Sequence, residues 1–305
     1  MKPVICIAGP TASGKSAFAM DVAAVLDGEI INADALQVYA DLQILSARPT
    51  QDEMGSIPHH LFGHVSGRVR YSTGHWLREV DPLILDILAR GKTPILVGGT
   101  GLYFRALLHG MADIPPTPKA IFDDTQSIYD EQGIEPLRAL AKGYDPICAQ
   151  RVLGDDPQRL MRIINVSRAT GRSLSEWQEN TRPVVPLRFA KYCALTPPRE
   201  PLYSRINNRY DAMLRGGGME EAKAIFSKGF DDGLPVMKAI GLRQLRSYFD
   251  GQSTLDEAIE LAKRDSRRFA KRQMTWFRNQ RPKAQTLETP SDKAGFLQSL
   301  KELEL

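Results

Sequence analysis

The chain has 305 residues, of which 42% are hydrophobic and 25% are charged, and this composition is typical of a folded protein with a substantial core. The length predicts one large domain or two, and the net charge of +4 excludes a protein that is basic over its whole surface. Cys6, Cys148 and Cys193 form no CxxC pair and indicate neither a disulfide framework nor a cysteine zinc site. No stretch reaches the ~18 apolar residues that a membrane span needs. We expect a cytoplasmic monomer with no membrane partner.

Strands alternate with helices in the first hundred residues. Short apolar runs predict strands at residues 3–8, 29–33 and 93–98, and amphipathic stretches predict helices at residues 16–26 and 81–91. Such an alternation favours a parallel sheet with helices on both faces. The predicted fold class is therefore α/β.

The pattern changes near residue 112. A proline-rich stretch, IPPTPKA, precedes several helical segments with no strand among them, and RFAKYCALT at residues 188–196 is typical of a strand again. We predict an all-helical domain at residues 112–186, inserted into a core of residues 1–111 and 187–283. Residues 284–305 carry no usable signal, and we expect them to form a C-terminal tail.

A phosphate-binding loop follows the first predicted strand. Residues 9–16, GPTASGKS, fit the pattern GxxxxGK[ST] between a strand and a helix. In such a loop, backbone N–H groups converge on phosphate oxygens, Lys15 adds a positive charge, and the Ser16 hydroxyl suits Mg²⁺. The predicted phosphate site comprises Gly9, Pro10, Thr11, Ala12, Ser13, Gly14, Lys15 and Ser16.

The loop pattern alone does not identify the phosphorylated ligand that it binds. Nucleotide hydrolases and kinases place an aspartate at the end of a buried strand. Here the strand at residues 93–98 is followed by Gly99 and Thr100, whereas a carboxylate, Asp34, follows the strand at residues 29–33. A diphosphate that is not part of a nucleotide also fits such a loop, and ATP binding stays open.

Eight motifs occur in one order along the chain, and together they closely resemble the tRNA dimethylallyltransferases, the tRNA isopentenyltransferase family of bacterial type. They are GPTASGKS, INADALQVY, ARPT (47–50), IPHHL (57–61), VGGTGLYFRALL (97–108), DPQRLMR (156–162), AIGLRQL (239–245) and AKRQMTWFRN (270–279). The resemblance implies a P-loop NTPase-like core. It also implies transfer of a dimethylallyl group from dimethylallyl diphosphate to the exocyclic amine of the adenosine 3′ of the tRNA anticodon, with diphosphate as the leaving group.

The resemblance implies roles for individual residues. Asp34 matches the family's general base, Thr100 a residue close to the transfer site, and Arg209 an arginine that contacts the diphosphate. Lys15, the loop amides and Mg²⁺ near Ser16 would stabilise the charge that develops on the leaving group. From the residues alone, Asp34 is also a candidate helix N-cap or Mg²⁺ ligand, Thr100 a candidate N-cap, and Arg209 a surface ion-pair partner.

A basic helix and two short segments are the predicted RNA-binding elements. Helical spacing places one face of the helix in solvent, with Gln273 on the opposite side, and that basic face comprises Arg264, Arg267, Arg268, Lys271, Arg272 and Arg278. A solvated surface helix is the alternative. The resemblance implies that the tRNA anticodon stem-loop contacts Asp34, Ala35, Leu36, Gln37, Thr100, Gln158, Arg159, Leu160, Met161, Arg162, Arg268, Lys271 and Arg272.

The sequence departs from the family pattern at Ala35, Leu45 and Leu242, where the family has serine, glycine and tyrosine. These departures bear on substrate contacts rather than on the chemistry, because the charged positions are kept. The pair His59-His60 has no further ligands at zinc spacing, so packing or a hydrogen bond is its expected role.

Three other functions stay open. They are a kinase or nucleotide hydrolase, a prenyltransferase of free adenine nucleotides, and a non-catalytic RNA-binding protein. The end of the strand at residues 93–98 counts against the first, and the basic helix and helical insertion count against the second. The combination of Lys15 and Asp34 counts against the third.

Overall fold

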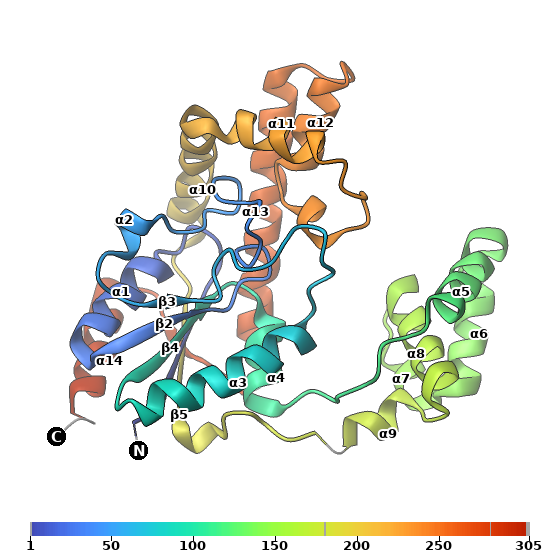
Figure 1. Ribbon diagram of the computed structural model, residues 1–305, viewed down its shortest axis with the longest axis horizontal. Coiled ribbons are helices and arrows are strands. Elements are labelled where there is room, and N and C mark those ends of the chain that lie inside the picture. Colours follow the sequence, from blue (N-terminus) through green and yellow to red (C-terminus); the bar gives the residue numbers. More distant parts are fainter. Residues whose placement is uncertain (1, 180, 281, 303–305) are drawn as a thin grey trace. The chain divides into compact units, whose positions relative to one another are not determined.

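The fold is seen in a computed structural model that describes residues 2–179, 181–280 and 282–302 (Figure 1). The chain divides into two compact units. Unit 1 comprises Met1–Leu108 and Val184–Leu305, and unit 2 comprises His109–Pro183. Each boundary of unit 2 lies three residues before the corresponding boundary of the predicted insertion at residues 112–186.

Unit 1 is built on one six-stranded sheet in which the described strand pairs are parallel. The strands are β1 (Val4–Ala8), β2 (Gly28–Asn32), β3 (His59–His60), β4 (Thr93–Gly98), β5 (Ala190–Leu195) and β6 (Gln285–Leu287), in the order β3-β2-β4-β1-β5-β6. β1 is central, with Ile5 opposite Ile95 of β4 and Lys191 of β5. The predicted α/β fold with a parallel sheet is confirmed.

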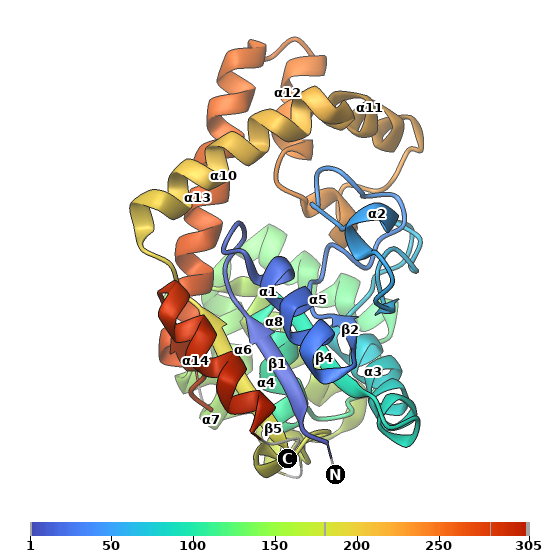
Figure 2. The same ribbon diagram turned by 90° about the vertical axis from the view of Figure 1, so that its left-hand side faces the viewer.

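Side chains that alternate along the strands give the sheet two buried faces, each covered by helices. Ile5 and Ile7 pack with α1 (Lys15–Leu26) and α14 (Pro290–Lys301), which lie side by side in Figure 2. Cys6 and Ala8 point to the opposite face, where α3 (Thr73–Ala89) and α4 (Gly101–His109) contribute Trp76 and other large side chains. The carboxyl ends of β1, β2 and β4 meet at one edge, which is where open parallel sheets bind their ligands.

The C-terminal residues correct the expectation of a separate tail. β6 pairs with β5, and Phe296 and Leu300 of α14 are only 3% and 1% exposed in the same apolar cluster as Phe18. Residues 284–302 therefore belong to unit 1. A three-residue edge strand and one short helix leave little periodicity in the sequence, because their burial depends on long-range pairing.

The other elements of unit 1 are mostly helical, and Figure 1 shows α10 to α13 together at one end of that unit. They are α2 (Gln51–Met54), η1 (Leu187–Phe189), α10 (Arg199–Met213), η2 (Leu214–Gly218), α11 (Met219–Ser227), η3 (Pro235–Lys238), α12 (Leu242–Phe249) and α13 (Leu255–Asn279). α3 begins well before the predicted residue 81, because Ser72 caps it by accepting the His75 N–H, and Pro82 lies inside the helix.

The regular elements of unit 2 are all helices among its described residues. Its elements are α5 (Lys119–Gln132), α6 (Ile134–Tyr144), α7 (Pro146–Gln150), α8 (Pro157–Thr170) and α9 (Leu174–Glu179). Its core is a separate apolar cluster centred on α6 and α8. The five-residue α7 is the one helix here that the sequence pattern did not indicate; Asp145 caps it by accepting the Cys148 N–H over 2.9 Å.

Candidate active site

The phosphate loop leaves β1 after Ala8 and enters α1 at Lys15. Ala12 and Gly14 have left-handed backbone conformations, with φ of 60° and 86°, and Gly14 adopts this conformation without strain at the N-terminus of α1. The Ser13 hydroxyl is buried and has no hydrogen-bond partner among the described residues. A buried donor left unsatisfied at a helix N-terminus is what a phosphate ligand would satisfy.

Two positive charges reach this loop from different helices. Lys15 Nζ donates to the Pro10 carbonyl over 3.3 Å, and the guanidinium of Arg209, from α10, donates to the Thr11 hydroxyl. Burial lowers the pKa of Lys15 to about 8, while the charge of Asp34 acts to raise it and that of Arg209 to lower it. Burial also lowers the pKa of Arg209, again opposed by Asp34. These groups therefore share one electrostatic environment, and an anionic ligand would relieve the repulsion between the two cations.

Asp34 is held at the carboxyl end of β2 by hydrogen bonds on both sides of it. Its N–H donates to Asn32 Oδ1 over 2.8 Å, and Leu36 N–H donates to Asp34 Oδ1 over 3.0 Å. Thr100, just before α4, accepts the Ala35 N–H on its Oγ1 over 2.9 Å. The chain continues from Asp34 into turns, so Asp34 caps no helix. The Thr100 hydroxyl likewise fixes the turn that carries Asp34, and its described bond is not a helix cap.

Gln273 of α13 connects these two parts of the site, although the helical pattern predicted only that it lies on the buried side of a helix. Its side chain is 6% exposed; Oε1 accepts the Thr11 N–H over 3.0 Å and Nε2 donates to the Gly99 carbonyl over 2.9 Å. The partners are 262 and 174 residues away along the chain, so no local pattern could have indicated these bonds.

The turn after Asp34 contains Gln37, a predicted RNA contact whose side-chain amide is hydrogen-bonded within the protein. Gln37 Nε2 donates to the carbonyls of Ser46, over 3.1 Å, and Ala47, over 2.8 Å. The amide nitrogen therefore holds the segment at residues 42–49 against the turn. Ala35, Leu36 and Gln37 are all half-buried, so the turn is only partly accessible to a large ligand.

The departures from the family pattern fill apolar space. Leu45 and Leu242 are 7% and 0% exposed and lie in one apolar cluster, and Ala35 packs against another. A leucine that replaces glycine or tyrosine at these two positions contributes to packing within unit 1. Neither leucine side chain is available for contact with RNA.

The basic face of α13 is largely as predicted. Arg264, Arg268, Lys271 and Arg272 are exposed, and so is Arg278. Arg267 corrects the prediction, because it is half-buried and donates to Asn207 Oδ1 of α10 over 2.7 Å. On a helical wheel, Arg267 lies at the border of the basic face, where the neighbouring helix α10 covers it.

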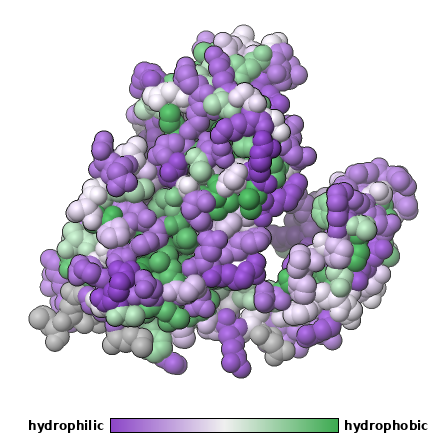
Figure 3. Space-filling view, in the orientation of Figure 1, coloured by the Kyte–Doolittle hydropathy of each residue, from purple (hydrophilic) through white to green (hydrophobic). Residues whose placement is uncertain are grey.

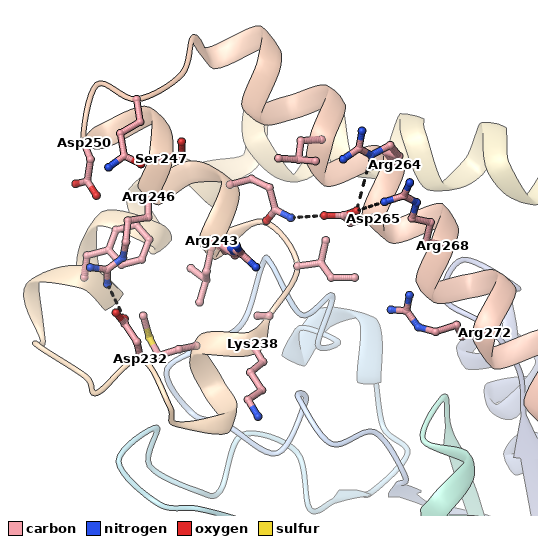
Figure 4. A pocket seen from close by; sticks show the side chains of 18 residues that line it. Asp232, Lys238, Arg243, Arg246, Ser247, Asp250, Arg264, Asp265, Arg268 and Arg272 are labelled. Carbon is pink, nitrogen blue, oxygen red and sulfur yellow. Dashed lines mark hydrogen bonds and ion pairs between the residues drawn. The ribbon is translucent and has the colours of Figure 1, made fainter. Parts of the chain in front are cut away.

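A groove beside this face collects further cations (Figure 4). Its volume is about 1100 Å³, and α12, α13 and η3 line it. Its cations are Lys238, Arg243, Arg246, Arg264, Arg268 and Arg272, against the acids Asp232, Asp250 and Asp265. Asp265 lies within 3.6 Å of Arg268, whereas Lys238, Arg243 and Arg272 form no ion pair with a described residue. Hydrophilic residues also dominate this part of unit 1 in Figure 3.

Five further predicted RNA contacts lie on α8 of unit 2. Gln158, Arg159 and Arg162 are exposed, and Arg159 pairs with Asp156 over 3.1 Å. Leu160 and Met161 correct the prediction, because they are 0% and 6% exposed in the core of unit 2. Consecutive residues of a helix point in different directions, so a helical segment cannot present all of its side chains to one ligand.

The two histidines behave as expected for structural residues. His60 Nε2 lies 2.7 Å from Glu29 Oε2, and His59 Nδ1 lies 2.8 Å from the Ile57 carbonyl. Within the described part of the chain, no group of three or more histidine, cysteine, aspartate or glutamate side chains could hold a metal ion. No helix in that part is both long enough and apolar enough to cross a membrane.

Comparison with known proteins gives one consistent result. The family model described as IPP transferase matches residues 37–280, and one described as isopentenyl transferase matches residues 2–61. A tRNA dimethylallyltransferase of Hyphomonas neptunium is 47% identical over 284 residues, covering 92% of this chain and 90% of its own length. One from a Caulobacter species is 43% identical over 286 residues, covering 94% and 93%.

Solved structures agree. A tRNA isopentenylpyrophosphate transferase of Bacillus halodurans superposes with a TM-score of 0.69 at 32% identity, covering 100% of this chain and 99% of its own. A eukaryotic dimethylallyltransferase acting on tRNA has a TM-score of 0.79 at 29% identity, covering 91% and 70%. This chain therefore belongs to the IPP transferase family, the family of the tRNA-modifying tRNA dimethylallyltransferases.

Proposed function

We propose that this protein transfers the dimethylallyl group of dimethylallyl diphosphate to the N6 amine of the tRNA adenosine on the 3′ side of the anticodon, and releases diphosphate. The observation that carries the proposal is the convergence of a phosphate loop, two half-buried cations and one carboxylate at the carboxyl edge of the sheet. The family relationship supplies the two substrates. We place this reaction in the cytoplasm, with the protein as a monomer.

The cations serve the leaving group. When the allylic C–O bond breaks, negative charge accumulates on the diphosphate, and Lys15, Arg209 and the loop amides are preorganised around the site where it would lie. Because burial weakens the hydration of Lys15, the lysine gains more from a bound anion than an exposed lysine would. The Ser13 hydroxyl adds a donor that is otherwise unsatisfied.

Mg²⁺ fits this loop as a companion of the diphosphate. Mg²⁺ prefers oxygen ligands and keeps several waters, so it needs few protein groups. The exposed Ser16 hydroxyl at the first turn of α1 would hold it. The ion would neutralise charge on the leaving diphosphate.

Asp34 serves the nucleophile. The adenine amine loses a proton as its nitrogen forms a bond to the allylic carbon, and a carboxylate within hydrogen-bond reach can accept that proton. Asp34 Oδ1 is engaged by Leu36 N–H, so its orientation is fixed while Oδ2 remains for the substrate. Thr100 acts through the turn by holding Ala35. The exposed cations of α13, the groove of Figure 4 and the exposed residues of α8 supply contacts for RNA phosphates. The adenosine has to leave its stack to reach Asp34.

Mass spectrometry of tRNA incubated with dimethylallyl diphosphate, Mg²⁺ and the protein tests the proposal. We expect one dimethylallyl group on the adenosine 3′ of the anticodon, and unmodified tRNA would contradict it. Asp34→Asn should bind RNA normally but lose turnover by about 10²-fold or more, because it removes the base without changing its shape. Normal turnover of Asp34→Asn would remove Asp34 from this role.

Two controls separate the other functions. Incubation with labelled ATP and no RNA should release little phosphate; appreciable release would favour a hydrolase or kinase. AMP should be a poor acceptor compared with an anticodon stem-loop, and the reverse order would favour a prenyltransferase of free nucleotides.

A further inference from the structure

A single buried amide, that of Gln273, joins the phosphate loop to the end of β4. Both of its polar atoms are bonded to backbone, Oε1 to the Thr11 N–H and Nε2 to the Gly99 carbonyl. An amide side chain that accepts from one loop and donates to another fixes the distance and the relative orientation of the two. Gln273 is buried, whereas Arg268 and Arg272 of the same helix are exposed.

Thr11 is held twice, from two helices. Gln273 of α13 accepts its backbone N–H, and Arg209 of α10 donates to its hydroxyl. The two helices are themselves joined by Arg267 to Asn207, over 2.7 Å. The Thr11 N–H is therefore not free to bind phosphate, and the position of Thr11 decides where the loop amides that follow it point.

The other end of the amide lies close to Asp34. A Cβ atom placed on Gly99 would lie 2.3 Å from Gln273 Nε2, 3.4 Å from Asp34 Oδ2 and 3.4 Å from the Gly9 carbonyl. Only glycine at position 99 allows the amide to approach this closely. The phosphate loop, the Asp34 carboxylate and the Gln273 amide therefore meet around Gly99.

We propose that Gln273 is a positioning residue that holds the phosphate loop in register with the Asp34 carboxylate, so that the diphosphate ester and the adenine amine meet in line. The inference rests on the proposed function. Loss of the two bonds should leave RNA binding unchanged, weaken diphosphate binding and misplace the reacting atoms, and a misplacement of about 1 Å can cost on the order of 10²-fold in rate. The effect should therefore fall mainly on kcat rather than on the KM for RNA.

Gln273→Glu distinguishes the hydrogen bonds of this side chain from its packing, because only the hydrogen bonds change with the protonation state of the glutamate. The carboxylate of Gln273→Glu can accept from Thr11 but cannot donate to Gly99, whereas the protonated acid can do both. Burial and the charge of Asp34 favour the neutral acid, whereas the charges of Lys15 and Arg209 favour the carboxylate. We therefore expect the kcat of Gln273→Glu to be about 10²-fold below that of the wild type at pH 8. The kcat of the variant divided by the kcat of the wild type should be at least 10-fold higher at pH 6 than at pH 8.

Gln273→Met serves as the matched variant, because it has similar volume and neither hydrogen bond. Its loss of kcat should be similar at both pH values, with the KM for RNA within about twofold of wild type. Leu300→Ala, a buried α14 position away from the site, controls for lost stability, and circular dichroism checks that each variant is folded. If Gln273→Met keeps turnover within threefold of wild type, or if the Gln273→Glu ratio does not change with pH, the inference is wrong.

Diphosphate binding keeps this test separate from the proposed function. Isothermal titration calorimetry with inorganic diphosphate and Mg²⁺ measures the affinity of the phosphate loop for diphosphate without any transfer reaction. We expect this affinity to be about 10-fold lower in Gln273→Met. A wild-type protein that binds diphosphate but modifies no RNA contradicts the proposed function alone. Unchanged diphosphate affinity together with unchanged kcat in Gln273→Met overturns the inference alone.

Discussion

Lys15 is an unfavourable residue for the ligand-free fold, and this can be measured. Burial lowers its pKa from 10.5 to about 8. One pKa unit corresponds to ~1.4 kcal/mol, so below pH 8, where both the folded and the unfolded chain are protonated, burying the charge costs about 3 kcal/mol. The bond from Nζ to the Pro10 carbonyl returns on the order of 1 kcal/mol. Lys15→Met should therefore raise the free energy of unfolding at pH 7 by about 2 kcal/mol.

The pH dependence of the free energy of unfolding shows whether the charge of Lys15 stabilises or destabilises the folded protein. Between pH 8 and 10.5 the unfolded chain binds more protons at Lys15 than the folded protein does, so the stability of the wild type rises with pH across this window. The advantage of Lys15→Met should shrink over the same window. Urea unfolding of both proteins, at pH 7 and at intervals up to pH 10.5, gives the difference. Diphosphate with Mg²⁺ should stabilise the wild type more than Lys15→Met, since the variant lacks one of the two cations that the ligand pairs with.

Two results would refute this reasoning. Lys15→Met could be less stable than the wild type at pH 7, which would mean that the lysine is well solvated or compensated in the ligand-free loop. The difference in stability could also be independent of pH between 8 and 10.5, which would place the pKa of Lys15 elsewhere. Loss of turnover in Lys15→Met on the order of 10²-fold accompanies either result and does not discriminate between them.

Other variants test separate parts of the structure. Arg209→Met should raise the KM for dimethylallyl diphosphate by about 10-fold to 10²-fold in steady-state assays, with the KM for RNA unchanged, because a charged hydrogen-bond donor is lost. Arg272→Gln should reduce the slope of log affinity for RNA against log salt by about 1, measured by filter binding between 50 and 200 mM salt. Glu29→Gln should lower the free energy of unfolding by about 2–3 kcal/mol at pH 7 and by almost nothing near pH 2, because bonds from Arg90 lower the pKa of Glu29 to about 2 and that stabilisation is lost as pH falls from 4.5. Phe296→Ala should cost about 3–5 kcal/mol in urea unfolding if α14 belongs to the core, and almost nothing if it were a tail.

Local patterns predicted what depends on local sequence. The strand at residues 93–98 coincides with β4, and the loop from Gly9 to Ser16 connects β1 to α1, because apolar runs and glycine-rich turns are encoded within a few residues. The short strand β3 escaped prediction, since two residues carry no periodicity. α14 escaped it for a similar reason, because Phe296 and Leu300 become informative only once β6 has paired with β5.

The sequence predicted the roles of residues only where those roles depend on a single helix and not on its neighbours. The wheel of α13 separated exposed cations from buried residues, but it could not show that α10 covers Arg267. The segment at residues 158–162 included two core residues, Leu160 and Met161, because a sequence motif does not record which side chains face inward. No local pattern could indicate Gln273 as a site residue, since both of its hydrogen-bond partners lie more than 170 residues away along the chain.

The end of β4 explains how a loop typical of nucleotide hydrolases can serve alkyl transfer. Hydrolases need a carboxylate near the phosphates, at a strand end, to hold Mg²⁺ or to orient water. In this protein β4 ends at Gly98, and the neutral amide of Gln273 occupies the space above Gly99. A neutral amide is not a base, so Gln273 cannot accept a proton from a water molecule or replace a carboxylate as a Mg²⁺ ligand of negative charge. The nearby carboxylate, Asp34, lies in the loop two residues after the end of β2. In the proposed reaction, the end of β4 therefore supplies no carboxylate, and Asp34 is the group that would accept the proton of the adenine amine.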